Sequence, residues 1–142
     1  MPLSEAERQS FLAEPHVGAL AVTRPEPGRA PLAVPIWYAY EPGGELWITT
    51  GRDSAKARAL AHAGRFSLLA ERVEPTVRYV SVEGPVVSSE PTTAKEQRDM
   101  VTRYLPPEAV EPFLGLAARE HGPQLTFRMR PEHWLSADLG GF

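Results

Sequence analysis

Cysteine is absent from this chain of 142 residues, and lysine is nearly absent. Without a thiol the chain has no disulfide and no thiolate metal site. The basic residues number 15, but only Lys56 and Lys95 are lysines, so arginine carries almost all of the positive charge. The formal net charge of −3 gives no reason to expect nucleic acid or an anionic membrane surface as a partner.

Long apolar runs are also missing. No segment approaches the roughly 20 apolar residues that a membrane-spanning helix needs. The first residues, MPLSEAERQS, are acidic and polar, unlike the basic and then apolar start of a signal peptide. The chain contains no internal repeat and is long enough to bury a core of its own. We therefore expect one domain over residues 1–142, soluble and cytoplasmic.

The motifs of common hydrolases and metalloenzymes are missing as well. There is no GxSxG elbow, no P-loop and no GxGxxG. The histidines have no metal-ligand spacing and form no HExxH pattern; they are His16, His62, His121 and His133. We therefore predict no metal site and assign no catalytic side chain. If the protein is an enzyme, a bound cofactor carries the reaction.

The most informative segment covers residues 45–60, ELWITTGRDSAKARAL. It predicts a strand, a short polar turn and an alanine-rich helix capped by Ser54 or Asp53. The first N–H groups of such a helix point out over the turn, where Arg52 and Lys56 add positive charge. A helix N-terminus beside cations suits an anion, and a phosphate best of all. An ordinary turn with solvated basic side chains explains the same residues.

Alternating apolar residues predict six strands along the chain. These cover residues 16–23, 31–40, 45–50, 66–70, 77–87 and 124–130. Pro35 cannot donate to a ladder, so the second of these strands should lie at an edge or break there. Gly84 and Pro85 predict a bulge or bend in the fifth.

Capping signals predict at least three helices. Ser4 and Thr93 begin capping boxes, and the turn before Ala55 begins another helix. A shorter helical piece, interrupted by Pro112, follows the helix that starts at Thr93, and residues 131–136 lead into a short tail. Because the strands are joined mostly by hairpins, the fold class is mainly β: a small antiparallel β-barrel decorated with helices.

Three motifs follow one another in a recognisable order: PLAVPIWYAY, TTGRDSAKARAL and RYVSVEGPVV. Their order and spacing resemble the FMN-binding split-barrel family related to pyridoxamine 5′-phosphate oxidase. The resemblance covers roughly residues 16–84, with a family-like final strand and Trp134. It implies a six-stranded antiparallel Greek-key split barrel that acts as a homodimer, with two cofactor sites at the subunit interface.

The resemblance also implies an elongated cofactor site with parts for a ring, a ribityl chain and a phosphate. Four consecutive residues would lie along the isoalloxazine ring through their backbone, two threonines would approach the ribityl or phosphate part, and a serine and a lysine would hold the phosphate. A tyrosine would reach the cofactor from the second subunit, and a tryptophan would cover the ring or the substrate. In that order the residues are Val34, Pro35, Ile36, Trp37, Thr49, Thr50, Ser54, Lys56, Tyr79 and Trp134.

Several of these aromatic residues have a second interpretation. Trp37, Tyr38 and Trp47 fit a barrel core or a dimer interface equally well. Within a flavin site, Tyr38 and Tyr79 are the candidate proton donors.

The chain departs from the founding enzyme of the family in two respects. It lacks the C-terminal arginine motif that grips pyridoxal phosphate, and an apolar strand replaces an arginine-rich one. It looks most like a subgroup of short bacterial relatives that use the deazaflavin coenzyme F-420 in place of FMN. The resemblance thus implies an oxidoreductase that transfers a hydride to or from a small organic substrate with F-420, or alternatively FMN. A non-catalytic flavin- or deazaflavin-binding protein and an FMN-dependent pyridoxamine 5′-phosphate oxidase remain alternatives.

Overall fold

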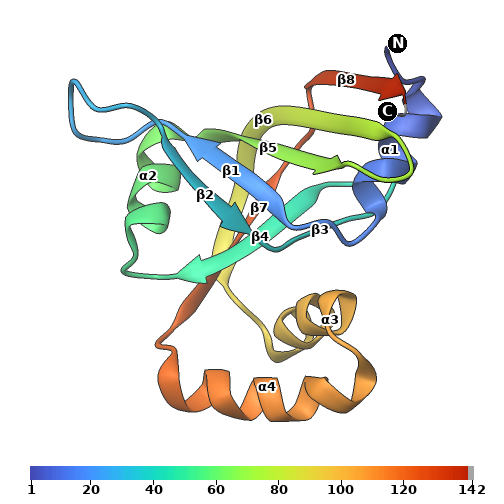
Figure 1. Ribbon diagram of the computed structural model, residues 1–142. Coiled ribbons are helices and arrows are strands. Elements are labelled where there is room, and N and C mark those ends of the chain that lie inside the picture. The colour runs from blue at the N-terminus through green and yellow to red at the C-terminus, as the bar shows by residue number, and fades with distance from the viewer. Residues whose placement is uncertain (141–142) are drawn as a thin grey trace.

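The computed structural model describes residues 1–140, which form eight strands and four helices (Figure 1). The helices are α1 (Glu5–Ala13), α2 (Ala55–Ala63), α3 (Ala94–Tyr104) and α4 (Pro107–Glu120). The strands are β1 (Gly18–Val22), β2 (Leu32–Ile36), β3 (Tyr38–Tyr40), β4 (Leu46–Gly51), β5 (Arg65–Arg72), β6 (Val77–Pro91), β7 (Gln124–Met129) and β8 (His133–Gly140).

The strands form one curled antiparallel sheet. Its order is β2-β1-β5-β6-β7-β4-β3, and β8 pairs with β6 off this path. β2 and β3 stand at opposite ends of the order, yet only Trp37 separates them in the chain. The chain therefore leaves one end of the sheet and enters the other, which curls the sheet into a split barrel.

The prediction of six strands is wrong at two places. Residues 31–40 alternate like one strand, but Ile36 pairs with Gly18 of β1 whereas Tyr38 pairs with Ile48 of β4. The strand divides because its two halves belong to different parts of the sheet. Residues 131–136, expected to lead into a short tail, lead instead into β8, which begins at His133 and pairs with the first half of β6.

β6 is long enough to pair with two neighbours in succession, β8 along its first half and β7 along its second. Between the halves, the connection from β7 to β8 crosses β6 closely. The N–H of Arg130 donates to the carbonyl of Pro85 at 3.1 Å. A Cβ on Gly84 would lie 1.8 Å from the Arg130 carbonyl oxygen, so only glycine fits there. The irregularity predicted at Gly84 and Pro85 is this crossing, and the register shift follows directly after Val86.

The predicted helix starts are confirmed. Ser4 and Thr93 both form complete capping boxes, and Ser54 caps α2 by accepting the N–H of Ala57 at 3.1 Å. α2 ends at Ala63 and is capped by Gly64, whose φ of 71° is the left-handed conformation expected of a C-terminal glycine.

The predicted interruption at Pro112 is wrong, because α4 runs without a break from Pro107 to Glu120. Pro112 lies in the second turn, where its missing N–H removes a single intrahelical hydrogen bond. A helix of 14 residues tolerates that loss.

The inward side of the barrel carries the core. The predicted alternation of residues 31–40 is confirmed, since Leu32, Ile36 and Tyr38 are buried and Pro35 is exposed. Pro35 also lies where the sequence predicts, on a strand that, among the described strands, pairs with β1 alone. The largest fully buried side chains include Tyr38, Phe127, Leu12, Leu20, Leu46, Ile48, Leu60, Leu68 and Met129.

The helices lie around the sheet at different places (Figure 1). In this view α2 lies at the left of the sheet and α1 at the right, while α3 and α4 lie below it. The buried residues of α3 and α4 stand outside the main core cluster; they are Met100, Val101, Val110 and Ala117. These two helices therefore form a cap with a small core of its own. Within residues 1–140, no helix has both the length and the apolar character that crossing a membrane requires.

Candidate functional site

Two hydroxyl groups hold the turn between β4 and α2. The side chain of Thr50 is 4% exposed, and its hydroxyl lies 3.0 Å from the hydroxyl of Ser54. The N–H of Ser54 donates to the carbonyl of Gly51 at 3.0 Å. These contacts fix the first turn of α2 on the end of β4.

The first turn of α2 differs from those of the other helices in its charge. It contains no acidic residue and carries Lys56 instead, although acidic side chains are the ones that a helix N-terminus favours. The amide N–H groups of Ala55 and Lys56 find no acceptor within residues 1–140, and the lysine amine forms no ion pair there. This end of α2 is therefore open to an anion. The acidic first-turn residues elsewhere are Glu5 and Glu7 of α1, Glu96 of α3 and Glu108 of α4.

The two arginines of the turn contact Asp53. Arg52 forms an exposed ion pair with its carboxylate at 3.3 Å, and Arg58 donates to its backbone carbonyl at 3.2 Å. Lys56 is therefore the cation of the turn that remains available to a ligand.

A cavity of about 190 Å³ lies between the sheet and the cap formed by α3 and α4. Ile36 and Trp37 line it from the β2–β3 bend, and Thr49 lines it from β4. Met100 and Phe113 line it from the cap. A second cavity, also of about 190 Å³, shares five lining residues with the first, so the two form one hollow.

Gln124 connects this hollow to the α2 turn. It lines both cavities, and it pairs with Gly51 at the end of β4. The N–H of Arg52 donates to the carbonyl of Pro123 at 2.8 Å. The hollow and the N-terminus of α2 are therefore neighbours, arranged one after the other along β4.

Stacked aromatic rings make one wall of the hollow rigid. The ring of Trp37 lies 4.7 Å from that of Tyr104 with 12° between their planes, and Phe113 lies 5.7 Å from Trp37. The Tyr104 hydroxyl donates to the carbonyl of His16 at 2.7 Å and accepts the N–H of Tyr38 at 3.1 Å. The cap is thus tied to both the β2–β3 bend and the segment before β1.

The predicted site residues fall into three places. Six of the ten adjoin the hollow or the α2 turn: Ile36, Trp37, Thr49, Thr50, Ser54 and Lys56. Val34 and Pro35 line an open apolar hollow of about 380 Å³ on the outer face of β2, β1 and β5. Tyr79 pairs with Glu71 at the rim of that outer hollow. Trp134 lies in a third place, beside α1.

Tyr38 is excluded as a proton donor. Its side chain is fully buried, and its hydroxyl donates to the carbonyl of Leu12 at 2.7 Å. Burial raises the pKa of Tyr38 well above its usual range. The core interpretation therefore holds for this residue, while Tyr79 is partly exposed and stays a candidate.

Sequence reasoning missed the contribution of the cap. Met100, Val101 and Phe113 lie on helices, and their helical spacing gives no sign that they border a hollow. Gln124 carried no signal of its own, since it begins a regular strand. Among the residues that the structure describes, no histidine or acidic side chains gather into a group of three that could hold a metal ion.

Comparison with known proteins identifies a family. The family model described as pyridoxamine 5′-phosphate oxidase matches residues 4–137. No curated protein matches the chain significantly.

Solved structures share the fold. A conserved hypothetical protein from Mycobacterium tuberculosis is 26% identical with a TM-score of 0.69, covering 96% of this chain and 85% of that one. An F420 reductase is 21% identical with a TM-score of 0.62, covering 89% of this chain and 94% of that one. An FAD-binding protein from Mesorhizobium loti is 22% identical with a TM-score of 0.63, covering 97% and 95% of the two chains.

Proposed function

The chain belongs to the pyridoxamine 5′-phosphate oxidase family, and on that premise we propose that it is an oxidoreductase with a bound flavin-type cofactor. One observation carries the proposal. An apolar hollow walled by Trp37 and Phe113 lies directly beside a helix N-terminus that lacks acidic residues and carries Lys56. A flat ring suits the hollow, and a phosphate suits the free amides and the cation.

The residues of the chain fit the three parts of such a cofactor in order. Ile36 and Trp37 would border the ring, and Thr49 would lie beside the ribityl chain. Ser54 and Lys56, in the first turn of α2, would hold the phosphate. When bound, the cofactor would supply the hydride chemistry, while these residues orient it and keep water from the ring.

We favour the deazaflavin F-420 over FMN as the cofactor. β2 is apolar throughout, with no arginine to reinforce a flavin phosphate. An F420 reductase is among the proteins with the same fold. An FAD-binding protein shares the fold as well, so FMN is the competing cofactor in the test below.

We also propose that two copies of the chain form the complete site. Tyr79 lines neither cavity beside the α2 turn, so it would reach a cofactor only from a second chain. The outer hollow that Val34 and Pro35 line is apolar and open, and Val17 at its rim is 58% exposed. A second copy packed on this face would cover it. Trp134 belongs to a separate cavity and is not part of this proposal.

Titration with F-420 and with FMN, followed by fluorescence quenching, tests the proposal. We expect F-420 to bind more tightly, with a dissociation constant below about 100 μM, a binding free energy near −5.5 kcal/mol. If neither cofactor binds below that concentration, the proposal fails. Sedimentation of the complex measures the expected dimer in the same preparation.

The reading of the protein as a non-catalytic binder differs in one measurable respect. A binder would hold reduced F-420 without passing its hydride on. Loss of the reduced-cofactor signal in the presence of a panel of small organic acceptors supports an enzyme. A protein that binds F-420 but oxidises it with none of the acceptors fits a carrier or sensor. Oxidation of pyridoxamine 5′-phosphate with bound FMN would favour an FMN-dependent pyridoxamine 5′-phosphate oxidase.

A further inference from the structure

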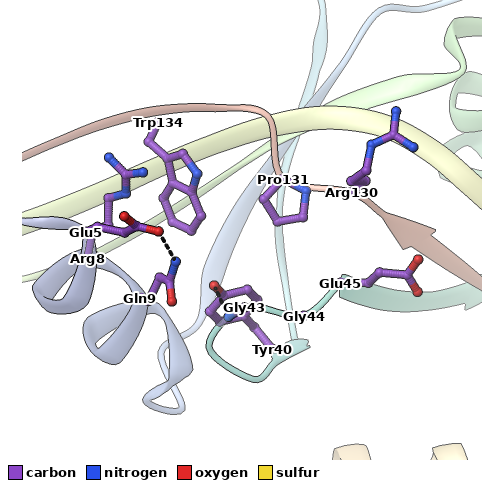
Figure 2. A pocket seen from close by; sticks show the side chains of 10 residues that line it. All are labelled: Glu5, Arg8, Gln9, Tyr40, Gly43, Gly44, Glu45, Arg130, Pro131 and Trp134. Atoms are coloured by element: carbon purple, nitrogen blue, oxygen red, sulfur yellow. Dashed lines mark hydrogen bonds between the residues drawn. The ribbon is translucent and has the colours of Figure 1, made fainter.

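A separate cavity of about 440 Å³ lies between α1, the β3–β4 turn and the connection from β7 to β8 (Figure 2). Its volume is in the range of small-molecule sites. The rings of Tyr40 and Trp134 form its apolar corner, 6.2 Å apart and nearly edge to face at 69°. In Figure 2 Pro131 lies between Trp134 and Arg130, on the side of the cavity away from α1. The cavity thus offers an aromatic corner to a flat ligand.

Arg8 brings an unpaired positive charge to this corner. Its guanidinium carbon lies 4.7 Å from the centre of the Trp134 ring. Its Nε is buried and has no hydrogen-bond partner within residues 1–140. No carboxylate lies within ion-pair distance of Arg8 in that part of the chain. The two terminal amines of Arg8 also form no hydrogen bond there and are not buried, so a ligand carboxylate in the corner can pair with them.

The other charges around the cavity are less effective. Glu5 and Glu45 also line the cavity, but both are exposed, so water screens their charge, and the Glu5 carboxylate accepts from the Gln9 amide at 3.4 Å. Arg130 is 60% exposed and pairs with Glu132 at 3.1 Å. Arg8 is therefore the charge that a ligand in the corner would meet first.

This cavity is distinct from the proposed cofactor site. Glu45, which lines it, comes directly before β4, whereas the α2 turn follows the last residue of β4. A strand of six residues separates the two places by about 20 Å. A single small molecule cannot occupy both within one chain.

We propose that the Arg8 cavity binds a small aromatic carboxylate, with its ring against Tyr40 and Trp134 and its carboxylate on the Arg8 guanidinium. The proposal goes beyond the cofactor function and does not depend on it. It assigns a second ligand to the protein, recognised by charge and ring together.

Titration of the ¹⁵N-labelled protein with sodium benzoate tests the proposal, with amide and indole N–H signals as the readout. We expect saturable shifts at Gly43, Gly44 and the Trp134 indole, and none at Lys56. Benzamide has the same shape without the charge, and we expect it to bind about tenfold more weakly. Benzylamine carries the opposite charge and should not bind.

A matched pair of variants isolates the guanidinium. Arg8→Gln should weaken benzoate binding about tenfold and leave benzamide binding unchanged. Arg130→Gln should change benzoate binding by less than about twofold, because Arg130 is already paired and exposed. A well-dispersed spectrum checks that each variant is folded.

Four results of the titrations with benzoate and its analogues overturn the proposal. They are an absence of shifts around the cavity, equal binding of benzoate and benzamide, stronger binding of benzylamine, and benzoate shifts confined to the α2 turn. Equal binding of sulfate at the Arg8 cavity would also overturn it, since the ring would then play no part. These wild-type measurements decide the question even if Arg8→Gln fails to fold.

Discussion

The two ends of β4 face ligands in different ways. At its C-terminal end, backbone N–H groups of α2 and a single lysine face the open side of a turn. At its N-terminal end, the arginine side chain of α1 lies on a tryptophan ring. One end offers backbone donors on a fixed helix, and the other offers a planar cation on an aromatic surface.

This difference indicates which anion suits each end. Converging N–H groups and a compact ammonium match a phosphate group, which is small, tetrahedral and negatively charged. A guanidinium stacked on indole matches a flat carboxylate attached to a ring. The chain uses arginine nearly everywhere, and it has one of its two lysines at the end where a point charge is the better partner.

The largest effect is expected from Gly84→Ala, which disturbs the connection from β7 to β8 near the N-terminal end of β4. Gly84→Ala places a methyl group against the Arg130 carbonyl, so β6 and the connection from β7 to β8 must separate. We expect a loss of about 3 kcal/mol in the free energy of unfolding, measured by urea denaturation.

Gly122→Ala is the matched control, since no atom of residues 1–140 lies within 4 Å of the added methyl group. It should change the free energy of unfolding by less than about 0.5 kcal/mol. Equal stability of the two variants would show that the crossing at Gly84 is not tight.

The next largest effect is expected on cofactor binding at the α2 end of β4. Lys56→Ala should weaken cofactor binding by about 1.5–3 kcal/mol, because it removes the cation that faces the phosphate. Lys95→Ala, a change of the only other lysine, is the control. Lys95 is paired with Asp99 at 2.7 Å on α3, so its loss should leave the affinity unchanged. An unaltered affinity in the Lys56 variant would show that Lys56 is a solvated surface residue without a cofactor contact.

A smaller effect is expected from the removal of helix N-caps, which distinguishes a loss of stability from a loss of cofactor binding. Ser54→Ala and Ser4→Ala each remove an N-cap, and each should cost about 1 kcal/mol in the free energy of unfolding. Only Ser54→Ala should also weaken cofactor binding, since α1 borders the separate Arg8 cavity and its first turn carries Glu5 and Glu7. Thermal unfolding and cofactor titration of both variants make the test. A similar loss of affinity in both variants would show that the loss comes from lower stability and not from a missing phosphate contact.

The smallest expected effect is on the pH dependence of stability, through Asp138 of β8, the strand that carries Trp134. The Asp138 carboxylate accepts from the N–H of Gly140 at 2.8 Å, the hydroxyl of Thr76 at 2.8 Å and Arg78 at 2.9 Å. These hydrogen bonds, the one from Gly140 first, lower the pKa of Asp138 from 3.8 to about 2. A carboxyl with a lowered folded pKa stabilises the fold above its unfolded pKa, and that contribution is lost as the pH falls.

Thermal midpoints measured below pH 4 test this prediction. The midpoint should fall as the pH drops from 3.8 towards about 2, and Asp138→Asn should fall less steeply. Equal slopes for the two proteins would show that Asp138 does not contribute to the pH dependence.

Local signals predicted most of the fold. Each cap that the sequence marked is present, and the alternation of residues 31–40 continues through both strands. The division at Trp37 was not predictable from that alternation, because the side chains keep their period while the hydrogen-bonding partner changes from β1 to β4. Pairing between distant segments leaves no mark on local periodicity.

The candidate site was predictable only where a local motif defines it. The turn around Ser54 and Lys56 follows from a strand, a polar turn and a helix cap in sequence. The hollow beside it also needs Phe113 and Gln124, which only tertiary packing brings to Trp37 and Gly51. The Arg8 cavity is of the same kind, since α1 and β8 meet there from opposite ends of the described chain.

The pairing of β4 with β7 also bears on how the chain is made. Ile48 meets Phe127 across the ladder, so β4 gains its second neighbour only after most of the chain has left the ribosome. Until then the nascent chain exposes one side of the strand that connects both sites. Contacts between such distant segments slow folding. We therefore expect most of the chain to be synthesised before β4 pairs with β7, and both ligand sites to form together when β7 docks.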